Sequence, residues 1–146
     1  MKKIKVVFIV VTICALALVL CACSVLNDAA KLQSYDFDND SVPSITSVVG
    51  DRDVTGTKKG TGTDGVYQEY TYKTDSVIED IQAYINKLQS QGWVITIIED
   101  DGASSGTVQL GNESSDSGKI ILLTIDYGAS SYTLNIKKST GTLNRF

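Results

Sequence analysis

The segment before Ser24 constrains this chain of 146 residues more than any other part of the sequence. It begins with three lysines within five residues, continues as an apolar or small run from Val6 to Leu20, and ends in small residues and cysteines. A basic start, a short apolar stretch and a small residue before a cleavage point are typical of a secretory signal peptide. The apolar run has about 15 residues, fewer than the roughly 20 that a membrane-spanning helix needs. We therefore predict that residues 1–22 are removed; retention as an uncleaved anchor is the alternative.

The end of this segment also carries a lipid-attachment pattern. Leu20, Cys21, Ala22 and Cys23 resemble the lipobox of bacterial lipoproteins, although Cys21 stands where lipoboxes more often carry Ala, Ser, Thr or Val. The resemblance implies cleavage between Ala22 and Cys23 and a diacylglyceryl group on Cys23. Two acyl chains give stable membrane attachment. We expect a mature chain that is anchored at the extracytoplasmic face of the cell membrane and does not span it.

Composition narrows the chemistry of the mature chain. Three of the 13 basic residues precede Cys23 and all 17 acidic residues follow it, so the mature chain has a net charge of −7. An acidic chain is repelled by nucleic acid, and we predict no nucleic-acid partner. Histidine is absent, and Cys14 and Cys21 leave with the signal. We therefore predict no disulfide, no metal site and no cofactor.

The first part of the mature chain has a polar character. We predict that residues 23–41 form a lipidated, flexible acidic tether and that residues 42–146 form one extracytoplasmic domain. Asp36, Asp38 and Asp40 alternate as in an EF-hand loop, but serines occupy the positions that require Gly and Glu. We interpret the three aspartates as a solvated linker.

Hydrophobic periodicity in residues 42–146 predicts the elements of the domain. Residues 44–49 fit either a short helix or a strand, and we favour a short helix or turn. Alternating apolar residues indicate strands at 54–59, 66–73, 93–99, 107–111, 119–127 and 132–136, with a loose tail after residue 138. A helix over residues 77–91 has a single apolar stripe that includes Ile78, a capping box of Ser76 and Glu79, and a terminating Gly92.

This pattern predicts an α+β fold. One amphipathic helix packs on a twisted antiparallel sheet in the order ββ-α-ββββ. The same alternation places Val94, Ile98, Ile120 and Leu122 on the sheet face opposite the helix. That face is either covered by the N-terminal segment or a surface for a partner.

Other motifs have a structural explanation. The glycine-rich stretch 56–62 lacks the Gly-Lys-Ser/Thr ending and the following helix of a phosphate loop, so we interpret it as turn chemistry. Glu99, Asp100 and Asp101 are interpreted as a solvated turn. Most tyrosines fall on core-facing positions, and Tyr35 and Tyr67 are the ones expected to be exposed.

The whole chain resembles small acidic lipoproteins of Gram-positive-type bacteria, which pair a tether with one α+β domain. That resemblance rests on size, charge and layout, and it implies no site residues. We expect a non-catalytic binding or adaptor module with a protein or glycan partner, and no catalytic residues. The alternatives are a structural accessory of a membrane complex and a carboxylate-dependent cell-wall hydrolase, which requires two acids in one cleft.

Overall fold

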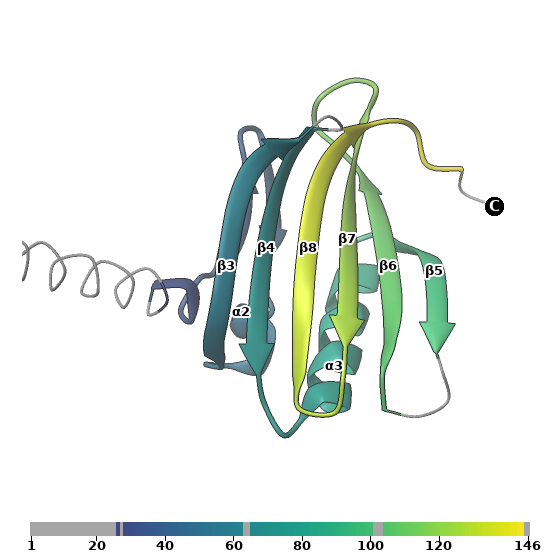
Figure 1. Cartoon of the computed structure of the whole chain (residues 1–146). Coiled ribbons are helices and arrows are strands. Elements are labelled where there is room, and N and C mark those ends of the chain that lie inside the picture. Colours follow the sequence, from purple (N-terminus) through teal and green to yellow (C-terminus); the bar gives the residue numbers. More distant parts are fainter. Residues whose placement is uncertain (1–25, 27, 63–64, 101–103, 145–146) are drawn as a thin grey trace, which may run out of the picture.

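A six-stranded antiparallel sheet dominates the computed structural model, which describes residues 26, 28–62, 65–100 and 104–144 (Figure 1). The signal segment and Cys23 lie outside the described residues. The strands of this sheet are β3 (Asp53–Gly62), β4 (Gly65–Lys73), β5 (Val94–Asp100), β6 (Gly106–Glu113), β7 (Lys119–Tyr127) and β8 (Ser131–Thr140). Their order across the sheet is β3-β4-β8-β7-β6-β5, so β3 and β5 form its two edges.

The α+β class is confirmed, but the predicted order ββ-α-ββββ is incomplete. A hairpin of β1 (Ser34–Phe37) and β2 (Asp40–Pro43) and a short helix α2 (Thr46–Val49) precede the sheet, and α3 (Val77–Ser90) follows β4. Residues 44–49, for which the sequence left helix and strand open, thus contain a short helix.

The hairpin corrects the prediction of a flexible tether up to residue 41. Tyr35, Phe37 and Val42 are buried in the core, and Tyr35 is therefore not the exposed tyrosine that the sequence suggested. Asp38 supports the tight turn with a left-handed φ of 48°, a conformation that aspartate tolerates better than most residues. Alternation with a period of two buries one side of this short ribbon.

Helix α3 follows its predicted range, but two details differ. Ser76 caps the helix without a side-chain hydrogen bond, so the predicted capping box with Glu79 does not form. Ile78 is 53% exposed, although the sequence assigned it to the buried stripe. Gly92 has a φ of 89° after the last turn, the left-handed conformation that the sequence predicted.

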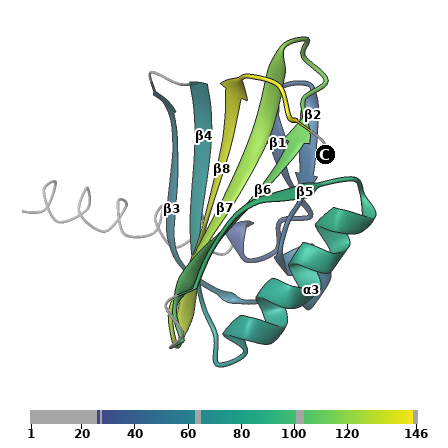
Figure 2. The ribbon, with the colours of Figure 1, turned by 90° about the vertical axis from the view of Figure 1, so that its right-hand side faces the viewer.

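One face of the sheet holds the hydrophobic core. Figure 2 shows α3 and the β1–β2 hairpin on the same side of the sheet. Side chains that alternate along the central strands point into this layer, as predicted, and all of the following are buried: Tyr70, Tyr72, Leu110, Ile121, Leu123, Ile125, Tyr132, Leu134 and Ile136. We call the other side of the sheet the open face.

The strand register corrects the predicted apolar face. Val94 pairs with Gly111, which pairs with Leu122, so these side chains share the open face. Ile98 instead pairs with the core residue Val108 and therefore lies on the helix side. A bulge between Ile95 and Ile97 shifts the alternation, and this places Ile98 opposite to its predicted face.

The C-terminal tail lies against the open face, whereas the β1–β2 hairpin lies on the helix side. A Cβ atom added to Gly111 would come within 2.8 Å of Leu143 Cδ2 and 3.4 Å of Leu122 Cδ2, so the leucine of the tail sits over this glycine. The Leu143 amide also donates a hydrogen bond to Glu113 Oε1 at 3.2 Å. In addition, β8 continues to Thr140, and the Gly141 amide donates a 3.0 Å hydrogen bond to the Gly118 carbonyl. The tail after residue 138 is thus held in place, where the sequence predicted a loose end.

Candidate functional site

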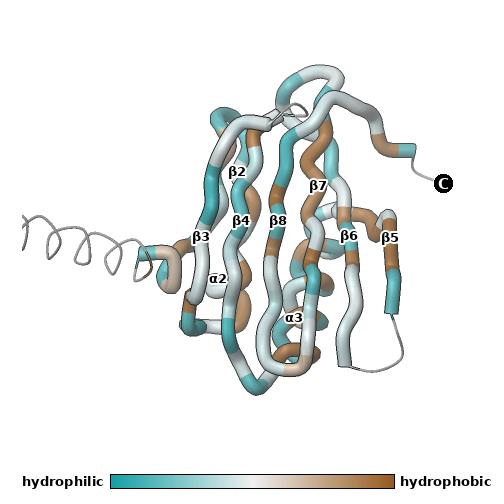
Figure 3. The backbone as a smooth tube through the Cα atoms, in the orientation of Figure 1, coloured by the Kyte–Doolittle hydropathy of each residue, from teal (hydrophilic) through white to brown (hydrophobic). Residues whose placement is uncertain are grey.

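Exposed isoleucines gather at one edge of the molecule. The exposed large apolar side chains among the described residues are Ile98 (65%), Ile78 (53%), Ile97 (40%), Val66 (40%) and Ile95 (37%), and three of these belong to the edge strand β5. Figure 3 shows β5 as hydrophobic over most of its length and hydrophilic only at its lower end. Large contiguous apolar patches on a protein surface are often interaction sites.

Both sides of β5 carry apolar side chains, and the bulge decides which isoleucine lies on which side. Ile97 pairs with Gln109 and shares its open face, whereas Ile95 and Ile98 pair with Leu110 and Val108 and share the helix side. In a regular strand, Ile95 and Ile97 would lie on the helix side and Ile98 on the open face. The bulge exchanges the sides of Ile97 and Ile98, and apolar side chains occupy both sides of the free margin of the sheet.

The flank of α3 extends this apolar margin. In a helix with 100° per residue, Asp80 lies on one flank of the buried stripe, and Ile78 and Ile85 lie on the other. Asp80 contacts Arg52, which immediately precedes β3. The flank with Ile78 and Ile85 consequently faces the opposite end of the sheet, toward β6 and β5. We call Ile78, Ile95, Ile97 and Ile98 the isoleucine edge.

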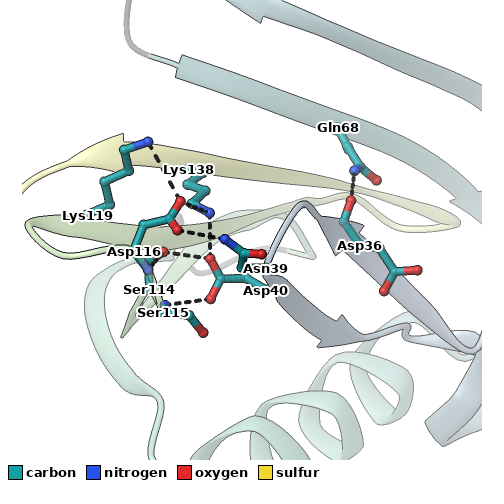
Figure 4. A network of polar contacts seen from close by, with 9 residues as sticks. All are labelled: Asp36, Asn39, Asp40, Gln68, Ser114, Ser115, Asp116, Lys119 and Lys138. Atoms are coloured by element: carbon teal, nitrogen blue, oxygen red, sulfur yellow. Dashed lines mark hydrogen bonds and ion pairs between the residues drawn. The ribbon is translucent and has the colours of Figure 1, made fainter.

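A buried ionic network lies away from this edge, where the hairpin meets the sheet (Figure 4). Lys138 Nζ lies 2.7 Å from Asp40 Oδ2 and 2.5 Å from Asp116 Oδ2, and only 5% of the Lys138 side chain is exposed. Asp40 also accepts hydrogen bonds from the Ser114 hydroxyl and the Ser115 amide, at 2.6 and 2.7 Å. These contacts tie the hairpin turn to β8 and to the loop after β6.

The network shifts the pKa of its members in the direction expected of an ion pair. Burial opposes ionisation of Asp40, but hydrogen bonds from Lys138, Ser114 and Ser115 outweigh it and hold the pKa well below its usual value. Hydrogen bonds to Asp116 and Asp40 raise the pKa of Lys138. All three groups are therefore charged at neutral pH. Lys119 Nζ lies 3.7 Å from Asp116 Oδ2 and supplies a second positive charge for the two carboxylates. Since the charges then balance, we assign the network a structural role.

A second buried polar cluster joins the hairpin, the helix and the sheet. The Tyr35 and Tyr72 hydroxyls are 2.8 Å apart, and the Tyr84 hydroxyl donates a 2.7 Å hydrogen bond to the Pro43 carbonyl. Burial raises the pKa of Tyr72 to about 12, so its hydroxyl stays neutral at neutral pH. Hydrogen bonds of these tyrosines thus hold the hairpin, the helix and the sheet together, where the sequence predicted only apolar packing.

The acidic residues at the end of β5 lie beside a shallow depression. Glu99 and Asp126 border a shallow depression of about 570 Å³ on the open face. Thr107 lies between them in the register, so the two backbones are two strands apart, about 10 Å. Asp126 also accepts a 2.6 Å hydrogen bond from the Thr107 hydroxyl. Asp101 lies outside the described residues. The hydrolase alternative stays a prediction.

A lysine-lined depression lies near the hairpin turn. Lys119, Lys137 and Lys138 border a space of about 660 Å³. The charge of Lys138 is taken up by Asp40 and Asp116, and Lys119 Nζ lies 3.7 Å from Asp116 Oδ2. The depression therefore offers less positive charge than its three lysines suggest.

The sequence missed most of the isoleucine edge. Of the four residues predicted as an interaction face, only Ile98 belongs to it, while Val94, Ile120 and Leu122 are partly buried. Tyr67 is partly buried, and its ring lies close to Gly60 on β3. The run of isoleucines from 95 to 98 beside an acidic turn was the available signal. It predicts a strand, but not that the strand lies at an edge.

Comparisons with known proteins add no family to this description. A search of protein-family models finds no match, and neither does a search of curated proteins or of solved structures. Within the described residues, no helix has the length and apolar character needed to cross a membrane. The same part of the chain contains no group of three or more His, Cys, Asp or Glu side chains placed to hold a metal ion.

Proposed function

We propose that this protein is a lipid-anchored extracytoplasmic lipoprotein and that its folded domain is a non-catalytic binding or adaptor module. The anchoring part rests on the signal-like segment and the lipobox residues Leu20 to Cys23. Only ten residues separate Cys23 from the start of β1 at Ser34. Even fully extended, this length of chain reaches about 35–40 Å. The domain is therefore held close to the membrane surface.

The isoleucine edge carries the binding part of the proposal. Four large apolar side chains, each more than one third exposed, make up this edge, whereas every other isoleucine and leucine of the described residues is buried or partly buried. Burial of apolar surface contributes about 25 cal/mol per Å². A partner that covers this margin would bury these side chains, and the complex would gain that free energy. In the isolated domain the same side chains stay exposed to water.

Anchoring is tested by changing the modified residue. In cells that express the full chain and are fed an alkyne-labelled fatty acid, we expect the label on the wild-type chain, which should fractionate with membranes. The Cys23→Ala variant should carry no label, even where its uncleaved apolar segment keeps it with the membranes. A wild-type chain without the label, or a Cys23→Ala variant that still carries it, would contradict lipid anchoring at Cys23.

Binding is tested with a photo-crosslinking amino acid placed in the living cell. The probe at Ile97 should give a discrete adduct, because that position lies on the isoleucine edge. The matched control is Val66, which is equally exposed at 40% but lies on β4, away from β5. An adduct pattern that is the same at both positions, or no adduct at either, would contradict a binding role for the edge.

A further inference from the structure

The backbone of β5 has an unused side. Within the described ranges β5 pairs only with β6, on one of its two sides, and is therefore an edge strand. The N–H and C=O groups on the free side of an edge strand are a ready template for another strand. In Figure 1, β5 stands at the margin of the sheet, with α3 behind the strands.

The opposite edge of the same sheet is protected, and β5 is not. On β3, Lys58 and Lys59 lie near the middle of the strand, and the strand has no exposed large apolar side chain. Charged residues, lysine above all, are a common device against edge-to-edge pairing. On β5 the corresponding middle positions are Ile97 and Ile98. The lysines on β3 thus disfavour pairing with another strand, whereas the isoleucines on β5 favour it. Of the two edges of this sheet, β5 is the one suited to strand addition.

The side chains of β5 set the character of an added strand. Alternate residues of that strand would lie on both sides of the sheet. Those on the open face would contact Ile97, and those on the helix side would contact Ile98 and Ile95. Ile78 on α3 would border the helix-side residues. The added segment therefore gains from apolar or β-branched side chains on both of its faces.

Charge determines which end of the added segment is basic. β5 ends in the acidic residues Glu99 and Asp100, and Glu99 is exposed. Every strand pair of the sheet is antiparallel, and antiparallel pairing is slightly the more stable arrangement. In an antiparallel addition, the N-terminal end of the added segment meets Glu99 and Asp100. A lysine or arginine there would complement them. A second copy of this chain would instead bring together two mature chains that each carry a net charge of −7.

From these observations we infer that β5 takes up an extended segment of a partner protein as a seventh strand of the sheet. The segment is rich in apolar or β-branched residues, runs antiparallel to β5, and begins with one or more basic side chains. This inference rests on the proposed binding role and specifies the partner's chemistry.

The experiment uses the full-length chain in detergent and synthetic peptides as probes. One peptide alternates valine and threonine after two N-terminal lysines, and its matched control begins with two glutamates. We expect the lysine peptide to slow hydrogen–deuterium exchange of the β5 amides and leave β3 unchanged. The glutamate peptide should bind about threefold to fivefold more weakly, the range for exposed charge pairs. Replacing Glu99 and Asp100 by lysine should reverse this preference.

Two variants and one modified peptide separate strand addition from nonspecific adhesion. Ile97→Thr should weaken binding at least fivefold, while Val66→Thr, a change at an equally exposed position elsewhere, should leave it unchanged. N-methylation of alternate peptide residues on the edge that faces β5 should abolish binding, because it removes the main-chain donors.

Several results would overturn the inference. Equal binding of the lysine and glutamate peptides, or binding that survives N-methylation, excludes the antiparallel strand addition described above. Dimerisation of the chain alone that Ile97→Thr abolishes would assign the edge to a second copy. Absence of peptide binding by a chain that is lipidated at Cys23 would refute strand addition and leave anchoring intact. Peptide binding by a chain that is not lipidated at Cys23 would refute anchoring and leave strand addition intact.

Discussion

Lys138 shows at the scale of single residues how the domain tolerates a buried charge. Its ammonium group contacts two carboxylates, one from the hairpin turn and one from the loop after β6. Removing one member of a buried ion pair leaves an uncompensated charge and typically costs about 3–5 kcal/mol. We therefore expect Lys138→Met to lower the free energy of unfolding by about 3 kcal/mol in urea denaturation. Combining it with Asp40→Asn should recover part of the loss; an additive double variant would contradict direct coupling.

The same network predicts how stability depends on pH. The pKa values of Asp40 and Asp116 are lowered in the folded chain, so their contribution is present above the unfolded value of about 3.9 and is lost as pH falls below it. The pKa of Lys138 is raised, so its contribution persists below about 10.4 and is lost only as pH rises further. Between pH 5 and pH 2 the wild type should lose more unfolding free energy than Lys138→Met. Parallel pH profiles would argue against this assignment.

At the scale of elements, the β1–β2 hairpin is part of the core. Tyr35 is 1% exposed, its ring centroid lies 4.6 Å from that of Tyr70, and its hydroxyl contacts that of Tyr72. Truncating a buried aromatic side chain costs about 3–5 kcal/mol. We expect that loss for Tyr35→Ala in urea denaturation. Tyr67→Ala, at a partly exposed tyrosine on the open face, should cost far less. A loss for Tyr35→Ala that is as small as the one expected for Tyr67→Ala would mean that the hairpin contributes little to stability.

The sequence predicts secondary structure well only where the spacing of apolar residues is regular. The six strands of the main sheet and α3 follow alternation or a helical stripe, and they appear near their predicted ranges. The hairpin was missed because Asp36, Asp38 and Asp40 gave the segment a polar character that masked the alternation of Tyr35 and Phe37. Its signals were that alternation and the Asp-Asn pair at the turn.

The isoleucine edge could not be predicted for two physical reasons. A period of two is unambiguous only in a regular strand, and the bulge after Ile95 reverses the faces of every residue beyond it. Which strand lies at an edge also depends on strand order, which local periodicity does not encode. The burial of Lys138 was equally hidden, since its two partners lie far from it in the sequence.

At the scale of the whole molecule, the proposed function combines a lipid anchor at Cys23 with the unpaired edge strand β5. In the proposed arrangement, the lipid on Cys23 and the short connection to β1 would hold the domain near the membrane surface. If β5 is the binding surface, changes on it should affect partner binding and spare the fold. We expect Ile97→Thr to change the free energy of unfolding by less than about 1 kcal/mol, as for most surface substitutions. A loss of several kcal/mol would mean that this side chain serves folding instead.

Export and anchoring are the part on which the proposed function most depends, and intact mass spectrometry of the mature chain tests them most directly. The account predicts a polypeptide that begins at Cys23 and carries a diacylglyceryl group on its sulfur. A chain that still begins at Met1, or one with an unmodified Cys23 thiol, would contradict it.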